Sequence, residues 1–355
     1  MTLTPLETTF LDLVAFDEVY PHEKQVLDYI KKRLDKAKIP WKQDKTRNII
    51  ARVNGGDAPA LALVGHTDIA APLAGRKVVI EPGVIKTDGT GLLGADDKAA
   101  VAIMLEIADQ APSNPPAGPV ELIFTVGEES GTQGAKGLTM ELVESRRMLV
   151  LDWAGSVANI VTKSPAYGKI DVEYIGRDAH PAEWQEGKNA GAALIEAAGS
   201  LQQGEYRSGI TCNIGVFNFG NARNKVPGQA ALQAEIRSFD THEVETAGAE
   251  IKAHFESVAK ARDIKPVVSV TVEAPAYQLN QSGELFAQLV SKLREHRLEP
   301  NLQPTYGCFD GNILASRDIE VIMLGVGGYN PHSPGEHLNR AEFAEALAIM
   351  LAVCR

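Results

Sequence analysis

Short apolar runs that alternate with helical segments constrain the fold of this 355-residue chain more than any other feature. The runs are LALV (61–64), ELIFTV (121–126), MLVL (148–151) and VIMLGV (321–326). Each has the length of a buried strand, and amphipathic or apolar helices are predicted over 97–110, 283–296 and 340–353. This alternation predicts an α/β domain in which helices cover both faces of a mixed sheet.

The segment 164–276 has a different pattern. Ile170, Val172 and Tyr174 alternate with polar residues, as in a strand with one buried face. The elements predicted after it are a helix at 190–203, strands at 210–219 and 229–238, a helix at 240–261 and a strand at 266–275. The order β-α-β-β-α-β is the ferredoxin-like arrangement. We therefore expect an α+β ferredoxin-like domain over 164–276, inserted into a first domain that consists of 1–163 and 277–355.

Composition excludes several classes of protein. The chain has 35 basic and 46 acidic residues and a formal net charge of −11, whereas general nucleic-acid or acidic-membrane binding needs basic surface. Cys212, Cys308 and Cys354 are too widely spaced for a disulfide framework or a thiolate zinc cluster. The first residues lack the pattern of a secretory signal, and no apolar run reaches about 18 residues. We expect a cytoplasmic protein that binds neither nucleic acid nor membranes.

Histidines and carboxylates collect where the apolar runs end. The residues concerned are His66 and Asp68 after the first run, Glu128 and Glu129 after the second, Asp152 after the third, His332 after the last, and Asp96 and Asp97 before the helix at 97–110. Each segment alone is more typical of a surface turn or a helix cap. Because ligands bind at the carboxyl ends of strands in open α/β sheets, their joint occurrence predicts one site. Imidazole and carboxylate donors suit a divalent ion such as zinc.

These segments carry a resemblance to a known family. GHTD, GADDK, GEES, LD and HSPGE, in this order and spacing, resemble the motifs of the M20 family of co-catalytic zinc metallopeptidases. The fragment TDGTGLLGADDKAAVA (87–102) is most similar to the peptidase T-like branch, the tripeptide aminopeptidases. The resemblance covers nearly the whole chain. It implies a zinc-exopeptidase-like catalytic domain with an inserted domain that serves as lid and dimerisation module.

The resemblance also implies a role for each motif residue. It implies two divalent ions, with zinc expected and cobalt or manganese as alternatives. Asp96 would bridge them, His66 and Asp152 would complete one ion, and Glu129 and His332 the other. Asp68 would hold the second ring nitrogen of His66, and Glu128 would act as general base.

Three residues of the inserted domain complete the implied site. His180 resembles a lid histidine that stabilises the oxyanion in the partner subunit's site of a homodimer, although a plain loop histidine is the alternative. Arg237 resembles an arginine that binds a substrate carboxylate, and Asn224 opens the same segment. From the pattern alone, Arg237 fits a solvated sheet face equally well.

Substrate identity stays open between several members of the family. The expected reaction is hydrolysis of an amide bond in a small peptide, with release of the N-terminal residue of di- or tripeptides. Carboxypeptidases, dipeptidases and N-acyl amino acid deacylases on the same scaffold are alternatives, and a non-catalytic binding protein is a further one. Trp153 beside Asp152, and Phe309 where the family has a small hydroxyl residue, depart from the family's pattern. A nucleotide enzyme is disfavoured because neither glycine-rich phosphate-binding motif is present.

Overall fold

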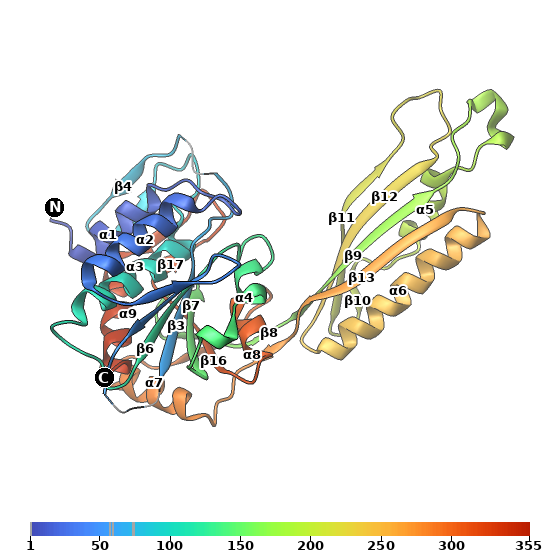
Figure 1. The fold of residues 1–355 in the computed structure, drawn as a ribbon. Coiled ribbons are helices and arrows are strands. Elements are labelled where there is room, and N and C mark those ends of the chain that lie inside the picture. Colours follow the sequence, from blue (N-terminus) through green and yellow to red (C-terminus); the bar gives the residue numbers. More distant parts are fainter. Residues whose placement is uncertain (1, 57, 59, 73–74) are drawn as a thin grey trace. The chain divides into compact units, whose positions relative to one another are not determined.

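The computed structural model describes residues 2–56, 58, 60–72 and 75–355, which divide into two compact units (Figure 1). Unit 1 contains Met1–Thr162, Gln278–Thr305 and Phe309–Arg355, and unit 2 contains Lys163–Tyr277 and Tyr306–Cys308. Each unit has its own sheet and its own helices. No helix in the described part of the chain is both long and apolar enough to span a membrane.

A mixed sheet organises unit 1. Its described strands are β1 (Trp41–Gln43), β2 (Ile49–Val53), β3 (Leu61–His66), β6 (Val120–Thr125), β7 (Arg147–Trp153), β8 (Asn159–Ser164), β14 (Tyr277–Gln278), β15 (Asn301–Pro304) and β16 (Glu320–Gly325). The order is β1-β2-β6-β3-β7-β16-β8-β14, and β15 pairs with β8. Strands β6, β3, β7 and β16 are parallel, whereas β2 and β8 flank them in antiparallel orientation. β3 and β6 are buried along their whole length, as the apolar runs predict.

The register of the parallel strands brings their carboxyl ends to one edge. His66, the last residue of β3, lies opposite Thr125, the last residue of β6. Val64 lies opposite Val150 of β7, which in turn lies opposite Met323 of β16. The residues that follow these strands therefore begin at the same level of the sheet.

Helices cover both faces of this sheet. They are α1 (Pro5–Val14), α2 (Lys24–Ala37), α3 (Ala95–Gln110), α4 (Gln133–Gly137), α7 (Glu284–Glu295), α8 (Asp310–Ala315) and α9 (Arg340–Val353), with the short 3₁₀ helix η1 (Met140–Leu142). Figure 1 shows α1, α2, α3 and α9 on one side of the sheet, and α4 and α8 on the other. Helix α1 begins with a capping box in which Thr4 and Glu7 satisfy each other's backbone N–H groups. The predicted α/β class with helices on both faces is confirmed.

A second, smaller sheet of unit 1 was not expected. It contains β4 (Val78–Ile80), β5 (Val84–Thr87), β17 (Gly328–Tyr329) and β18 (His337–Asn339). The order is β17-β18-β5-β4, so β18 pairs with β5 in antiparallel orientation. This pairing brings the segment after β16 next to the segment that precedes α3.

Unit 2 has the expected ferredoxin-like order with one additional strand. Its elements are β9 (Ala166–Ile175), η2 (Pro181–Glu186), α5 (Ala190–Gly199), β10 (Gly204–Arg207), β11 (Ile210–Phe219), β12 (Gln229–Ser238), α6 (Thr241–Ala261) and β13 (Lys265–Ala274). The antiparallel order is β10-β11-β12-β9-β13, and the short edge strand β10 is the addition. Ile170, Val172 and Tyr174 of β9 are buried, and they pack with Leu194 of α5 and Phe255 of α6 in the core of this unit.

Candidate functional site

His66 is the centre of a cluster of acidic side chains at the carboxyl edge of the large sheet. Its side chain is 1% exposed, and its Nε2 lies 3.0 Å from Asp96 Oδ1 and 3.7 Å from Asp152 Oδ1. Asp152 lies on β7, whereas Asp96 belongs to the first turn of α3, which follows the small sheet. Three separate elements therefore present their donor atoms to one point.

The Asp96 carboxylate also faces a second histidine. Its Oδ2 lies 3.1 Å from His332 Nε2, and that nitrogen lies 2.7 Å from Glu129 Oε1. Each oxygen of Asp96 is thus directed to a different imidazole. The hydrogen bonds with Asp96 and Glu129 raise the pKa of His332 to about 10, so this position favours positive charge.

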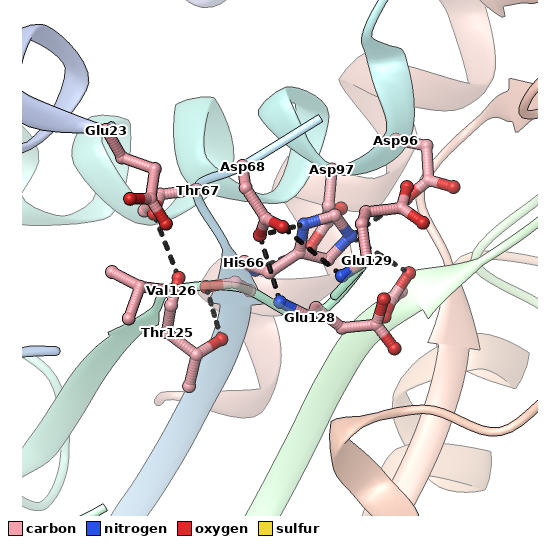
Figure 2. Close-up of polar contacts among 12 residues, drawn as sticks. Glu23, His66, Thr67, Asp68, Asp96, Asp97, Thr125, Val126, Glu128 and Glu129 are labelled. Carbon is pink, nitrogen blue, oxygen red and sulfur yellow. Dashed lines mark hydrogen bonds and ion pairs between the residues drawn. The ribbon is translucent and has the colours of Figure 1, made fainter. Parts of the chain in front are cut away.

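Asp68 organises the loop that follows β6. Its two oxygens accept hydrogen bonds from the backbone N–H groups of Glu128 (3.0 Å) and Glu129 (3.2 Å), as Figure 2 shows. Its Oδ1 also lies 3.3 Å from His66 Nδ1, in an ion-pair contact that falls short of hydrogen-bond geometry. One carboxylate therefore fixes the position of the histidine and of both glutamates.

Negative charge is crowded in this cluster. Burial raises the pKa of Glu128 well above its ordinary range, and the carboxylates of Asp310 and Glu129 act in the same direction. Burial also raises the pKa of Asp152, together with the neighbouring Asp96. Carboxylates that repel one another in a buried position need cations to offset them.

The donor atoms fit divalent cations. His66 groups with Asp96 and Glu129, and also with Glu128 and Asp152, with donor atoms within 4.8 Å of one another. Adjacent ligand atoms on a tetrahedral zinc ion lie about 3.3 Å apart when the bonds are about 2.0 Å, close to the separations around Asp96. Among the described residues, Asp152 Oδ2 is buried without a hydrogen-bond partner. An orphaned oxygen at this position is free to bind an ion.

Four further residues contact or border the cluster, and no role was predicted for them from the sequence. Asp97 accepts a hydrogen bond from the His66 N–H at 3.2 Å. Lys98 is fully buried, donates to the Thr67 carbonyl, and has its pKa lowered to about 8 by burial. Glu336 binds the backbone at the start of α3. Asp310 is 2% exposed, and neither of its oxygens has a hydrogen-bond partner among the described residues.

The sequence marks three of these residues as members of motifs, but it does not show what they contact. Lys98 lies in the GADDK motif, Glu336 in HSPGE, and Asp310 in the segment 307–311. Motif membership marks such residues as candidates. Their roles depend on contacts with residues distant in the chain, which no local pattern encodes.

The three lid candidates belong to unit 2, so the acidic cluster of unit 1 does not include them. His180 is exposed at the start of η2, where its Nδ1 accepts from the Ala182 N–H. Asn224 lies exposed in a turn. Arg237 forms a bidentate pair with Glu235 (3.0 and 3.1 Å) and donates to the Tyr306 carbonyl.

Two aromatic residues lie beside the cluster in the sequence. Trp153 follows Asp152, Phe309 precedes Asp310, and their rings meet edge to face with centroids 5.7 Å apart. Both are half-buried. The two departures from the family's motifs thus form one aromatic pair within unit 1.

The fold and the site define a class of enzyme. A mixed α/β sheet carries two histidines and a set of carboxylates at the carboxyl edge, with a ferredoxin-like domain inserted between its segments. The model of the peptidase family M20/M25/M40 matches residues 62–355, so the chain belongs to this family of metallopeptidases. The family resemblance predicted from the motifs is confirmed.

Several relatives match over nearly the full length. A Bacillus subtilis (strain 168) protein described as uncharacterized protein YqjE is 30% identical, in an alignment that covers 97% of this chain and 96% of the relative. A tripeptidase from Staphylococcus aureus subsp. aureus mu50 is 29% identical, with a TM-score of 0.89 over 98% of this chain and 96% of that structure. Aminopeptidase PepT from Bacillus cereus ATCC 10987 is 28% identical, with a TM-score of 0.86 over 98% and 97%.

Proposed function

We propose that the protein is an aminopeptidase with two divalent ions, expected to be zinc, that releases the N-terminal residue of di- and tripeptides. The observation that carries the proposal is the Asp96 carboxylate, whose oxygens face His66 at 3.0 Å and His332 at 3.1 Å. A carboxylate shared by two imidazoles is the arrangement that a bridging ligand requires.

The proposed ligands divide into two sets around Asp96. His66 and Asp152 would hold one ion, and Glu129 and His332 the other. When bound, such ions polarise the scissile carbonyl and lower the pKa of water toward neutrality. The cluster of carboxylates keeps the site close to charge balance.

Glu128 is the proposed general base and acid. Its carboxylate accepts a proton from the attacking water as the new C–O bond forms. It then gives that proton to the amine nitrogen as the C–N bond breaks. Burial and neighbouring carboxylates raise its pKa, which suits a group that must both accept and donate a proton. Asp68 holds the Glu128 backbone and sets the orientation of the His66 ring.

The three candidate residues of the 164–276 domain also have proposed roles, and that of His180 depends on formation of a homodimer. His180 would stabilise the oxyanion in the partner subunit's site of a homodimer formed through the 164–276 domain. Arg237 and Asn224 would bind the substrate carboxylate, and Arg237 would exchange its pair with Glu235 for that interaction. The assignment of 1–163 and 277–355 to the catalytic domain and a cytoplasmic location also stay predictions.

The proposal for an aminopeptidase, rather than another M20 enzyme, is supported by the relatives. The tripeptidase and the PepT aminopeptidase resemble this chain along nearly its whole length. The matching structures of a carboxypeptidase and a dipeptidase are only 14% and 13% identical to this chain, so they show the fold alone. The aromatic pair of Trp153 and Phe309 would line the substrate site next to Asp152.

A substrate panel tests the proposal. The purified protein, reconstituted in turn with zinc, cobalt and manganese, is assayed on free tripeptides, N-acetylated tripeptides and N-acyl amino acids. We expect release of the N-terminal residue from free peptides only, and about two metal ions per chain. The chelator-treated protein provides the blank. Release of C-terminal residues or cleavage of N-acyl amino acids would assign one of the alternative activities, and no cleavage at all would favour the binding protein.

A further inference from the structure

A buried carboxylate holds the backbone at the start of α3. Glu336 is 2% exposed, and its Oε2 accepts hydrogen bonds from the N–H groups of Leu93 (2.7 Å) and Gly94 (2.9 Å). Its Oε1 accepts from Ala95 (2.6 Å) and Asp96 (3.1 Å). Four consecutive amides, the segment Leu93–Asp96, therefore converge on one side chain.

The last of these donors is the residue proposed to bridge the two ions. Asp96 thus has its backbone held by Glu336 and its side chain directed to His332. Both partners lie on the segment Asn330–Glu336, and a turn in which the Glu336 N–H donates to the Ser333 carbonyl (3.0 Å) keeps them at fixed spacing. One short segment consequently contacts both the backbone N–H and the side-chain carboxylate of Asp96.

The chemistry of this contact is strong and directional. Hydrogen bonds to an ionised acceptor are roughly twice as strong as neutral ones, and successive N–H groups form a favourable concavity for an anion. Four backbone N–H donors point at the two Glu336 oxygens, an arrangement that stabilises the carboxylate form. A carboxylate satisfied in this way rigidly fixes the amides that it binds.

We propose that Glu336 is a positioning residue that sets Asp96 for metal binding and couples it to the His332 segment. This inference rests on the proposed two-metal site. Glu336 itself binds no ion, and it acts through the backbone of Leu93–Asp96. The positions of the proposed bridging carboxylate and of His332 then both depend on the segment Asn330–Glu336.

The variant Glu336→Gln tests this role. Glutamine has nearly the same side-chain volume as glutamate. In either orientation of the amide, however, its NH₂ group faces two backbone N–H donors and cannot accept their hydrogen bonds. Metal affinity is measured by competition with a chelator, and the ligand geometry by the visible absorption of the cobalt-substituted protein. We expect the metal affinity to fall at least tenfold, as for other residues that orient a ligand, and the cobalt spectrum to change.

A matched control separates this role from a structural one. Glu121 is 1% exposed and accepts from the Glu144 (3.0 Å) and Ser145 (2.9 Å) N–H groups, at the end of β6 opposite to the acidic cluster. Glu121→Gln should lose thermal stability and keep the wild-type metal affinity and spectrum. Glu336→Asp, which keeps the charge but shortens the side chain, should show an intermediate loss of affinity.

The outcomes are distinct. Wild-type metal affinity in whichever Glu336 variant folds overturns the positioning role. An equal loss of affinity in Glu121→Gln also overturns it, because the effect would then be general destabilisation. Failure of the unmodified protein to bind two ions contradicts the proposed function instead.

Discussion

At the scale of single residues, Asp68 shows how one side chain supports several others. It accepts the N–H groups of Glu128 and Glu129 and contacts the ring of His66, so the position of three site residues depends on two oxygen atoms. Glu336 likewise supports several residues at once, because its carboxylate accepts hydrogen bonds from four backbone N–H groups. Residues of this kind hold the backbone of other site residues in place.

The proposed base predicts a separation of metal binding from turnover. Glu128→Ala should keep both metal ions, because Glu128 is not among the proposed ligands. It should lower kcat by about 10²- to 10⁴-fold, the usual contribution of a positioned proton-transfer group. Elemental analysis gives the metal content and steady-state kinetics gives kcat. Full activity in this variant would show that another group moves the proton.

Asp68→Asn predicts the reverse pattern, with loss of metal. Each oxygen of Asp68 accepts one backbone N–H, so in either orientation the amide NH₂ faces a donor. We expect the metal affinity to fall about 10- to 100-fold. Chelator competition measures the affinity, and unchanged binding and turnover would mean that the His66 ring and the 128–129 backbone hold their positions without this carboxylate.

The place of the proposed ligands could be predicted because each of them follows a recognisable strand or begins a helix, and their roles as ligands came from the resemblance to the family's motifs. His66 and Asp152 lie at the ends of apolar runs, and parallel strands of equal register carry such residues to one edge. Lys98, Asp310 and Glu336 were not assigned, because their contacts join residues far apart in the chain. Leu93 and Glu336, for example, are 243 positions apart.

At the scale of elements, the first helix is tied to the last. Glu7 of α1 accepts hydrogen bonds from Arg340 at the start of α9, at 2.5 Å from Nε and 3.0 Å from Nη2. Hydrogen bonding from Arg340 lowers the pKa of Glu7. The same glutamate also completes the capping box with Thr4, so one side chain both begins a helix and anchors it.

This pair predicts a pH-dependent stability. A lowered pKa stabilises the fold above the ordinary value of 4.5, and the contribution is lost as the pH falls through the lower, folded-state value. Glu7→Gln should therefore lower the thermal midpoint by a few degrees at pH 7, and the difference from wild type should shrink below about pH 4.5. Scanning calorimetry of both proteins at several pH values measures this difference in thermal midpoint.

The exposed pair of Lys24 and Asp28 supplies the control for Glu7→Gln. These side chains lie 2.6 Å apart on the surface of α2, where solvent screens them. Asp28→Asn should leave the thermal midpoint nearly unchanged at neutral pH. A Glu7→Gln effect that is the same at all pH values would show that packing or capping, and not charge, accounts for it.

Long elements with clear periodicity were predicted well, and short strands were missed. Strands β11 and β12 have the predicted bounds, and in β12 a two-residue alternation over ten residues is a strong signal. Strand β10 has four residues, and each strand of the small sheet has two to four. Such strands owe their pairing to tertiary neighbours, so their sequences lack a comparable pattern.

At the scale of the whole molecule, two cores are stabilised by different means. Unit 2 has a hydrophobic core between one face of its sheet and helices α5 and α6. Unit 1 contains the acidic cluster in addition to its own apolar core. Metal binding is therefore expected to stabilise unit 1 selectively.

Calorimetry of the metal-loaded and chelator-treated protein tests this expectation. Zinc at about 1,000 times its Kd should stabilise unit 1 by about 4 kcal/mol per site and leave unit 2 unchanged. Ile251→Ala removes a fully buried side chain of α6, so it should cost unit 2 about 2–5 kcal/mol and keep the metal content. One transition that both changes shift equally would contradict the independence of the units.

The order in which unit 1 is assembled along the chain has a consequence for synthesis. The chain leaves unit 1 after Thr162 and returns at Gln278, so residues 163–277 emerge from the ribosome as one continuous block. His66, Asp96, Glu129 and Asp152 precede this block, whereas His332 and Glu336 follow it. A nascent chain therefore carries an incomplete acidic cluster until residues 332–336 are translated. The proposed second ion, which has His332 as a ligand, would therefore bind only after this segment has left the ribosome.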